Sequence, residues 1–255
     1  GIMRPSSAGS SRRAFCAVLT PALLQLFPSP PALASPRITG EVELRVAVGS
    51  DEPQVVVLGL YGEDAPASVA TFQGLCSGSL PGFPTLTYLG STASRVEKGK
   101  LIVLGKLTAG QAQDIERTLD NTGYVRNKLV NLAERFTNTD SNALTHDRAG
   151  LLTVVRGGGA FEFGLTPAPN MALDDQRLVI GEVVRGLDVV ELLNQVPARQ
   201  PSKDNEVGRV IYALGAYDET KYLAVAKAGG DPRSRIDQTY RPLQKIRISY
   251  CAVRK

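Results

Sequence analysis

Apolar residues in this chain fall into short runs that mostly alternate with polar positions. Residues 37–48 alternate around Val42, and residues 53–61 form a run rich in β-branched side chains. Because residues 49–52 between them are typical turn formers, the two segments predict a β-hairpin. Further strands are predicted at residues 86–96, 101–104, 151–155, 161–165, 178–184 and 243–253.

Helical spacing is clear in only two places. Residues 65–76 place Val69 and Phe72 on one face, with Asp64 expected to cap the helix and Gly78 to end it. The second core helix is predicted at residues 186–196, and a third helix at 218–228 within a long polar segment. Many short strands with two core helices favour a closed antiparallel barrel or a sandwich over repeated βαβ units.

Residues 1–34 have the order of a targeting leader. Arg12 and Arg13 precede an apolar run at 14–27, and a proline cluster and Ala32-Leu33-Ala34 follow. The arginine pair resembles a twin-arginine export signal, with cleavage expected after Ala34. An amphipathic helix is the alternative, but Pro21 interrupts the run.

The destination of such a leader is either the bacterial periplasm or the thylakoid lumen. The residues before the arginine pair, 5–11, are rich in serine and lack acidic residues, as chloroplast transit peptides do. We therefore expect a lumenal protein with a removable leader at 1–34 and a folded domain at 35–255.

Net charge does not indicate a nucleic-acid partner. The full sequence has a formal charge of +4, but without residues 1–34 it has 26 basic and 25 acidic residues. A single histidine argues against a histidine-rich metal site, and no nucleotide-binding loop motif is present. No apolar run approaches the roughly 20 residues of a spanning helix, so no transmembrane span is expected in the mature protein.

Five segments, in order along the sequence, resemble those of one family. They are VVVLGLY (55–61), APASVATFQGLCSG (65–78), YLGSTASRV (88–96), HDRAGLLT (146–153) and ALDDQRLVIGEV (172–183). On these residues the chain resembles the cyclophilin-type peptidyl-prolyl cis-trans isomerases. The resemblance implies a closed eight-stranded antiparallel barrel with a helix at each end and a peptide groove on its outer face. Segments 106–149 and 198–242 are longer than in the usual core, and the second is similar to that of some plant chloroplast members.

The resemblance also assigns the site residues. Arg95 matches the catalytic arginine of the family, and Leu101, Phe163, Leu173 and Arg177 match substrate-binding positions. The family needs neither a metal nor another cofactor. His146, the only histidine, matches a structural position.

Several pocket positions depart from the family pattern. Lys100 replaces a pocket phenylalanine, Val103 replaces a glutamine that binds peptide, and Arg177 replaces a histidine. An ungapped count places Gly164 at a second pocket phenylalanine, whereas a shift by a residue or two would place Phe161 there.

Two functions follow from this mixture. The first is a prolyl isomerase of reduced activity that acts on proline-containing proteins. The second is a binding module that has lost catalysis and serves as a subunit or assembly factor of a thylakoid membrane complex.

A disulfide is implied by the same resemblance. Cys76 and Cys251 match family positions that lie close together, and they are the only cysteines outside the leader. An exported compartment permits the bond, with two buried free thiols as the alternative.

Overall fold

The structure is a computed structural model that describes residues 36–83, 85–119, 121–199 and 240–254. The predicted leader, the helix expected at 218–228 and most of the 198–242 segment lie outside the described residues. The elements are β1 (Gly40–Val48), β2 (Gln54–Leu60), α1 (Pro66–Ser77), β3 (Arg95–Glu97), β4 (Leu101–Leu104), α2 (Ala109–Ala112), β5 (Gln113–Leu119), β6 (Val125–Asn131), η1 (Leu132–Arg135), β7 (Leu151–Val155), β8 (Phe163–Leu165), η2 (Met171–Leu173), β9 (Arg177–Arg185), α3 (Leu187–Asn194) and β10 (Ile246–Arg254).

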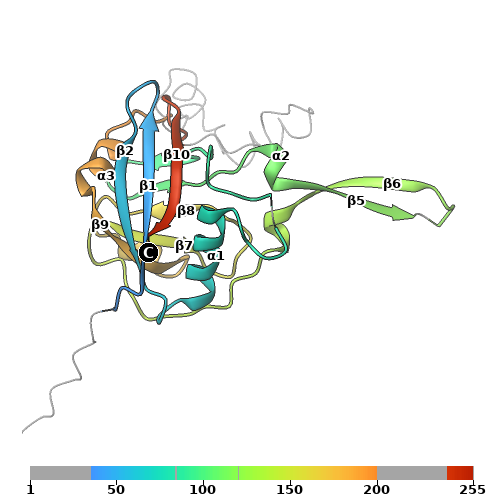
Figure 1. The fold of residues 1–255 in the computed structure, drawn as a ribbon, viewed down its shortest axis with the longest axis horizontal. Coiled ribbons are helices and arrows are strands. Elements are labelled where there is room, and N and C mark those ends of the chain that lie inside the picture. The colour runs from blue at the N-terminus through green and yellow to red at the C-terminus, as the bar shows by residue number, and fades with distance from the viewer. Residues whose placement is uncertain (1–35, 84, 120, 200–239, 255) are drawn as a thin grey trace, which may run out of the picture. The chain divides into compact units, whose positions relative to one another are not determined.

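Eight strands form one antiparallel sheet, in the order β10-β1-β2-β9-β7-β8-β4-β3. The predicted hairpin is β1–β2, in which Val42 pairs with Leu58. Register shifts in the β1–β10, β2–β9 and β7–β9 pairs are irregularities of the kind that bend a sheet, and the sheet curls around its core (Figure 1).

The sheet does not close into the predicted barrel. The edge strands β3 and β10 share no ladder. Residues just before β3 approach β10 instead, through an isolated bridge between Thr92 and Arg247. The strand predicted over 86–96 is correspondingly short, because residues 88–90 form a bend and a turn and only residues 95–97 pair as β3.

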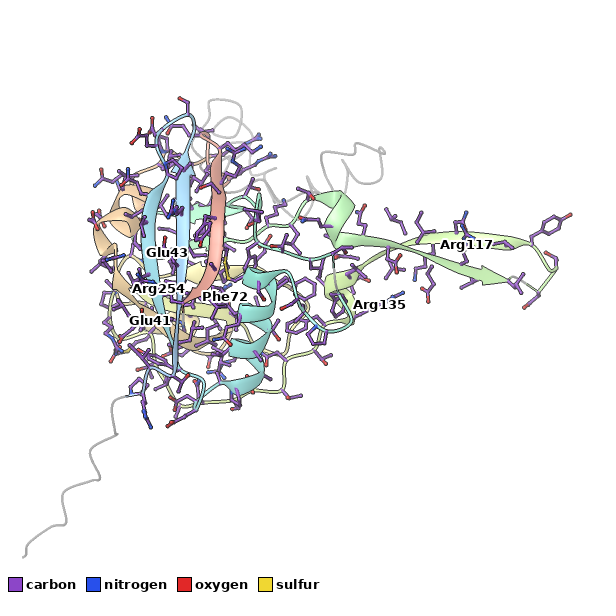
Figure 2. All side chains as sticks on the ribbon, viewed as in Figure 1. Glu41, Glu43, Phe72, Arg117, Arg135 and Arg254 are labelled. Carbon is purple, nitrogen blue, oxygen red and sulfur yellow. A yellow bond between two sulfur atoms is a disulfide. The ribbon has the colours of Figure 1, made fainter. Side chains whose placement is uncertain are left out.

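Alternating side chains from the sheet build the core. On the hairpin, the side chains of Val42, Leu44, Val56 and Leu58 are fully buried, as the period-two pattern requires. Figure 2 labels Phe72 of α1, which packs edge-on against Phe163 at 5.1 Å between ring centroids.

The first helix begins one residue later than its predicted cap suggested. Its N-cap is Ala65, without a side-chain hydrogen bond, so the prediction that Asp64 caps it is wrong. Pro66 occupies the first turn, where its missing N–H costs nothing. Gly78 ends the helix in the left-handed conformation at φ 67°, as predicted.

Residues 113–131 hold a hairpin that the sequence did not predict. Strands β5 and β6 pair only with each other, and Figure 1 shows them extending away from the large sheet. Nearly every side chain is exposed, so the alternating burial that marks a strand in sequence is absent. At its base, Arg135 lies 3.8 Å from the carboxylates of Asp114 and Glu116 (Figure 2).

A disulfide joins Cys76 at the end of α1 to Cys251 in β10, with their Cα atoms 5.0 Å apart (Figure 2). It is the pairing that the family resemblance implied. Next to it on β1, Glu41 and Glu43 approach Arg254 of β10 at 3.5 and 3.7 Å. Within the described part of the protein, no helix has the length and apolar character needed to cross a membrane.

Candidate functional site

The register of β3, β4, β8 and β7 aligns the predicted catalytic Arg95 with three further positions across the sheet. Arg95 pairs with Val103, Val103 with Gly164, and Gly164 with Thr153. Their inward neighbours Val96, Ile102 and Phe163 belong to the core, so these four positions point to the opposite side. We call this side the outer face; it consists of Arg95, Leu101, Val103, Thr153, Gly164 and Arg177.

Arg95 is held by two contacts on the outer face. Its Nη2 donates to Glu97 Oε2 at 3.0 Å, and its guanidinium lies 4.8 Å from the centre of the Tyr240 ring. The Tyr240 carbonyl accepts from Val96 N at 2.8 Å, so the backbone around Tyr240 runs beside β3. The side chain of Arg95 remains 39% exposed. Its Nε has no hydrogen-bond partner among the described residues.

Tyr240 is a site residue that sequence reasoning missed. Its backbone has a φ of 61°, which is uncommon for a residue other than glycine. It lies beyond a long segment with no alternating pattern, so only the fold places it beside Arg95. A Tyr followed by Arg241-Pro242 was the one available signal.

Lys100, which replaces a pocket aromatic of the family, pairs with Glu97 at the edge of the outer face. Its Nζ donates to Glu97 Oε1 at 2.7 Å, and its side chain is 61% exposed. Burial opposes ionisation of Glu97, but the hydrogen bond from Lys100 and the charge of Arg95 outweigh it and lower the pKa of Glu97. The hydrogen bond to Glu97 raises the pKa of Lys100. One carboxylate therefore joins both cations at the edge of the site.

Arg177 fills the space next to Gly164. A Cβ atom on Gly164 would lie 2.6 Å from Leu101 Cδ1 and 3.1 Å from Arg177 Nη2. Arg177 is 8% exposed, and its Nε and Nη2 donate to Oγ1 and the carbonyl of Thr153, both at 3.3 Å. Burial lowers the pKa of Arg177 to about 10, with a further lowering by the charge of Arg95 and an opposing effect of Glu162. A buried guanidinium thus occupies the position at which the resemblance expects an open apolar pocket.

Phe163, which the resemblance assigns to the substrate site, does not lie on the outer face. It is completely buried and packs against Phe72 and Tyr88 from the core side of β8. Phe161 is also buried, against Phe83 and Phe136. Neither aromatic residue therefore supplies the missing pocket wall.

The two leucines differ in their relation to this face. Leu101 begins β4, and its buried side chain lies beside Gly164 of β8. Leu173 ends η2 and is half-buried, a short turn before β9 begins. Glu162 sits just before β8, where its Oε2 accepts from Ser94 Oγ at 2.9 Å.

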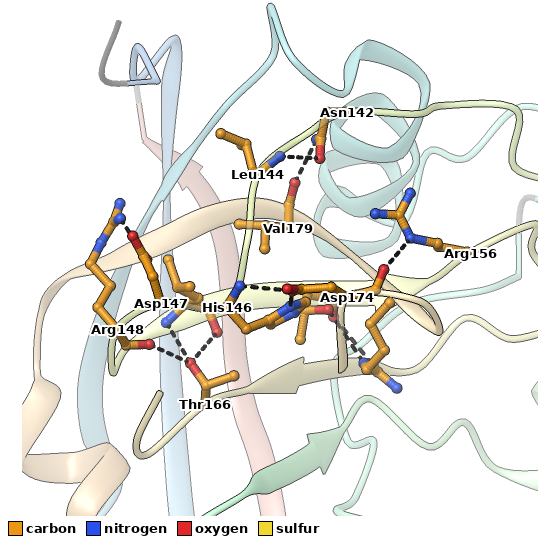
Figure 3. A network of polar contacts seen from close by, with 12 residues as sticks. Asn142, Leu144, His146, Asp147, Arg148, Arg156, Thr166, Asp174 and Val179 are labelled. Carbon is orange, nitrogen blue, oxygen red and sulfur yellow. Dashed lines mark hydrogen bonds and ion pairs between the residues drawn. The ribbon is translucent and has the colours of Figure 1, made fainter. Parts of the chain in front are cut away.

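His146 lies in a separate polar network (Figure 3). Its backbone N donates to Asp174 Oδ1 at 2.8 Å, and its Nδ1 contacts the same oxygen. The ring is fully buried, and its Nε2 has no partner among the described residues. Arg156 Nε donates to the Asp174 carbonyl at 2.8 Å. This geometry ties the loop before β7 to η2 and is consistent with a structural role for His146.

A curled eight-stranded antiparallel sheet with an arginine on the outer face of β3 defines the class of protein. The family model for the cyclophilin type peptidyl-prolyl cis-trans isomerase/CLD matches residues 45–212, and the chain belongs to this family. We found no group of three or more metal-ligating side chains in the described residues.

Curated relatives agree with this membership. Over 213 residues the chain is 26% identical to the chloroplastic peptidyl-prolyl cis-trans isomerase CYP28 of Arabidopsis thaliana, an alignment that covers 77% of this chain and 67% of the relative. It is 28% identical over 188 residues to peptidyl-prolyl cis-trans isomerase D of Saccharomyces cerevisiae, covering 72% and 75%. Identity to isomerase D of Eremothecium gossypii is 31% over 160 residues, which cover 59% of this chain and 39% of the relative.

Proposed function

We propose that this protein is a peptidyl-prolyl cis-trans isomerase of reduced activity that acts on proline-containing proteins in the thylakoid lumen. Rotation about a prolyl bond has a barrier of roughly 18–20 kcal/mol. A guanidinium that hydrogen-bonds near the prolyl nitrogen lowers this barrier by disfavouring amide resonance. Arg95 is the residue to which we assign this role, with Leu101 and Leu173 as substrate contacts.

The environment of Arg95 supports retained chemistry. Glu97 and the Tyr240 ring fix its guanidinium, while 39% of the side chain remains accessible to a peptide. A catalytic group gains most when its position is set before the substrate arrives. Glu97 and Tyr240 thus serve as positioning residues for Arg95.

The single observation that carries reduced activity is the burial of Arg177 over Gly164. A proline ring needs an apolar recess, and here a guanidinium and Leu101 fill the space beside the glycine. Because Lys100 is exposed, it does not replace the absent aromatic wall. A substrate held loosely would meet Arg95 in poor alignment, and misplacement by about 1 Å can cost on the order of a hundredfold in rate.

Lumenal location is part of the same proposal. The leader-like residues 1–34, the disulfide and the chloroplastic relative support it. Disulfides form in oxidising compartments and are rare in reducing ones. N-terminal sequencing of the native protein tests it: a mature protein that starts near Ser35 is expected, and one that retains Arg12 and Arg13 would contradict removal of the leader.

The isomerase assay uses residues 35–255 and a chromogenic peptide that is cleaved only with a trans prolyl bond. We expect weak acceleration, its loss in Arg95→Gln, and no change in Arg185→Met, an exposed control on β9. Replacing Arg177 by His and Gly164 by Phe together is expected to raise kcat/KM about tenfold or more, because the apolar wall returns. Activity equal to that of an ordinary cyclophilin would refute the account of a filled pocket.

The filled pocket also favours the second candidate, a binding module without catalysis that serves a thylakoid membrane complex. Absence of any acceleration in both the parent and the restored variant would select this candidate. Copurification from native membranes would then be the decisive measurement.

A further inference from the structure

The outer face has an excess of positive charge around a buried guanidinium that no carboxylate pairs with directly among the described residues. Arg177 is only 8% exposed, and no carboxylate among the described residues lies within 4.0 Å of its nitrogens. Its Nε and Nη2 both donate to Thr153, which leaves Nη1 without a hydrogen-bond partner in the part of the protein that the structure describes. The charge of Glu162 acts on Arg177 only from a distance, and a buried charge without a directly paired counter-ion is unfavourable, so an arriving anion would be stabilised there.

Arg95 stands close enough to act with Arg177 on one ligand. Arg177 Nη2 reaches to 3.1 Å from the Cβ position of Gly164, and Gly164 is two strands away from Arg95 through Val103. Two strand spacings amount to about 10 Å, which two extended arginine side chains can bridge together with a small anion. The charge of Arg95 lowers the pKa of Arg177, as expected for neighbouring cations, while the charge of Glu162 acts more strongly in the opposite direction.

Nearby carboxylates do not cancel this charge. Glu97 lies 3.0 Å from Arg95 and 2.7 Å from Lys100, so one negative charge serves two cations. Glu162 is directed to Ser94 Oγ at 2.9 Å. With Arg95, Lys100 and Arg177 against Glu97 and Glu162, the cluster keeps a net positive charge.

We propose that the outer face binds a carboxylate of an extended peptide, through Arg177 and Arg95, where an ordinary family member holds a proline ring. This inference rests on the proposed function in that it uses the same peptide-binding face. The carboxylate comes either from an acidic side chain next to proline or from the free carboxyl end of a polypeptide. Guanidinium groups suit either source, because they bind carboxylates with paired N–H donors.

Three peptides that carry an uncharged coumarin fluorophore test the proposal. They are Ala-Glu-Pro-Phe amide, Ala-Gln-Pro-Phe amide and Ala-Gln-Pro-Phe with a free carboxylate, each titrated with residues 35–255 at 50 and 300 mM NaCl. We expect at least one carboxylate peptide to bind about tenfold more tightly than the neutral amide, with the preference reduced at the higher salt. The two carboxylate peptides identify which source the site takes.

Variants then assign the preference to the arginines. Arg177→Gln should bind all three peptides like the neutral amide, whereas Arg177→Lys should keep part of the preference and Arg185→Gln, an exposed control on the same strand, all of it. If circular dichroism shows that Arg177→Gln does not fold, Arg95→Gln takes its place, and it too should bind all three peptides like the neutral amide. Equal binding of the three peptides by the parent protein, binding of none, or a preference that survives both substitutions overturns the proposal.

The isomerase assay on the neutral peptide separates the two ideas. Carboxylate selectivity without turnover would contradict the enzymatic function and uphold the anion site. Turnover without carboxylate selectivity would uphold the enzymatic function and contradict the anion site.

Discussion

The buried guanidinium of Arg177 predicts an unusual result: replacing it with methionine should stabilise the protein. Burial lowers its pKa to about 10, far below the ordinary value of an arginine. Each unit of pKa corresponds to about 1.4 kcal/mol, so holding the charge in this position costs about 3 kcal/mol. The two hydrogen bonds to Thr153 offset this by about 1 kcal/mol or slightly less each.

The net expectation for Arg177→Met is therefore a gain of about 1–2 kcal/mol in the free energy of unfolding. For a domain of this size that corresponds to a rise in Tm of roughly 3–6 °C. Urea denaturation followed by circular dichroism measures the free energy, and calorimetry measures Tm. Arg185→Met on the exposed end of β9 is the matched control and should change stability by less than about 0.5 kcal/mol.

The dependence on pH gives a second check. Because the pKa of Arg177 is lower in the folded state, its penalty is fully present below pH 10 and falls as the pH rises through 10. The advantage of the methionine variant should thus be constant at neutral pH and shrink above pH 10. A variant that is destabilised by more than about 1 kcal/mol at pH 7 would refute the reasoning and make Arg177 a stabilising residue.

Three further predictions concern stability away from the outer face. Replacing Cys76 and Cys251 by serine, or reducing the bond, should lower stability by about 3–5 kcal/mol on the chain-entropy model; calorimetry with and without reductant measures this, and an unchanged Tm would contradict it. Asp174→Ala should lower the free energy of unfolding by about 2–3 kcal/mol, because the backbone N and the Nδ1 of His146 both lose their partner. It should leave isomerase kinetics unchanged, and a loss of kcat would give the network a catalytic role. Deleting residues 113–131 and joining the ends by a short glycine linker should leave the large sheet folded, because β5 and β6 pair only with each other; collapse of the far-ultraviolet spectrum would refute this.

Local pattern alone predicted much of the sheet. Strands β4 and β7 match their predicted bounds, and the β1–β2 hairpin matches closely, because each buries alternate residues or an apolar run. The hairpin at 113–131 escaped prediction for the opposite physical reason, since both of its faces meet solvent. Likewise, residues 86–96 are apolar enough for a strand, but a turn at 88–90 interrupts them and only Arg95 and Val96 pair in β3.

The sequence by itself also determined which residue types are available to the site. It contained Arg95 in its motif, Lys100 in place of an aromatic residue, and the cysteine pair. The first two facts are local, because they depend on the order of residues in short segments, whereas the two cysteines lie 175 residues apart.

Only the tertiary structure decided which of these side chains meet. Strand register sends Phe163 into the core and Gly164 to the outer face, and a shift of one residue would exchange them. The close approach of Arg177 to Gly164, and of Tyr240 to Arg95, joins residues far apart in the sequence. Such contacts arise from the curl and pairing of the whole sheet, which no short stretch of sequence specifies.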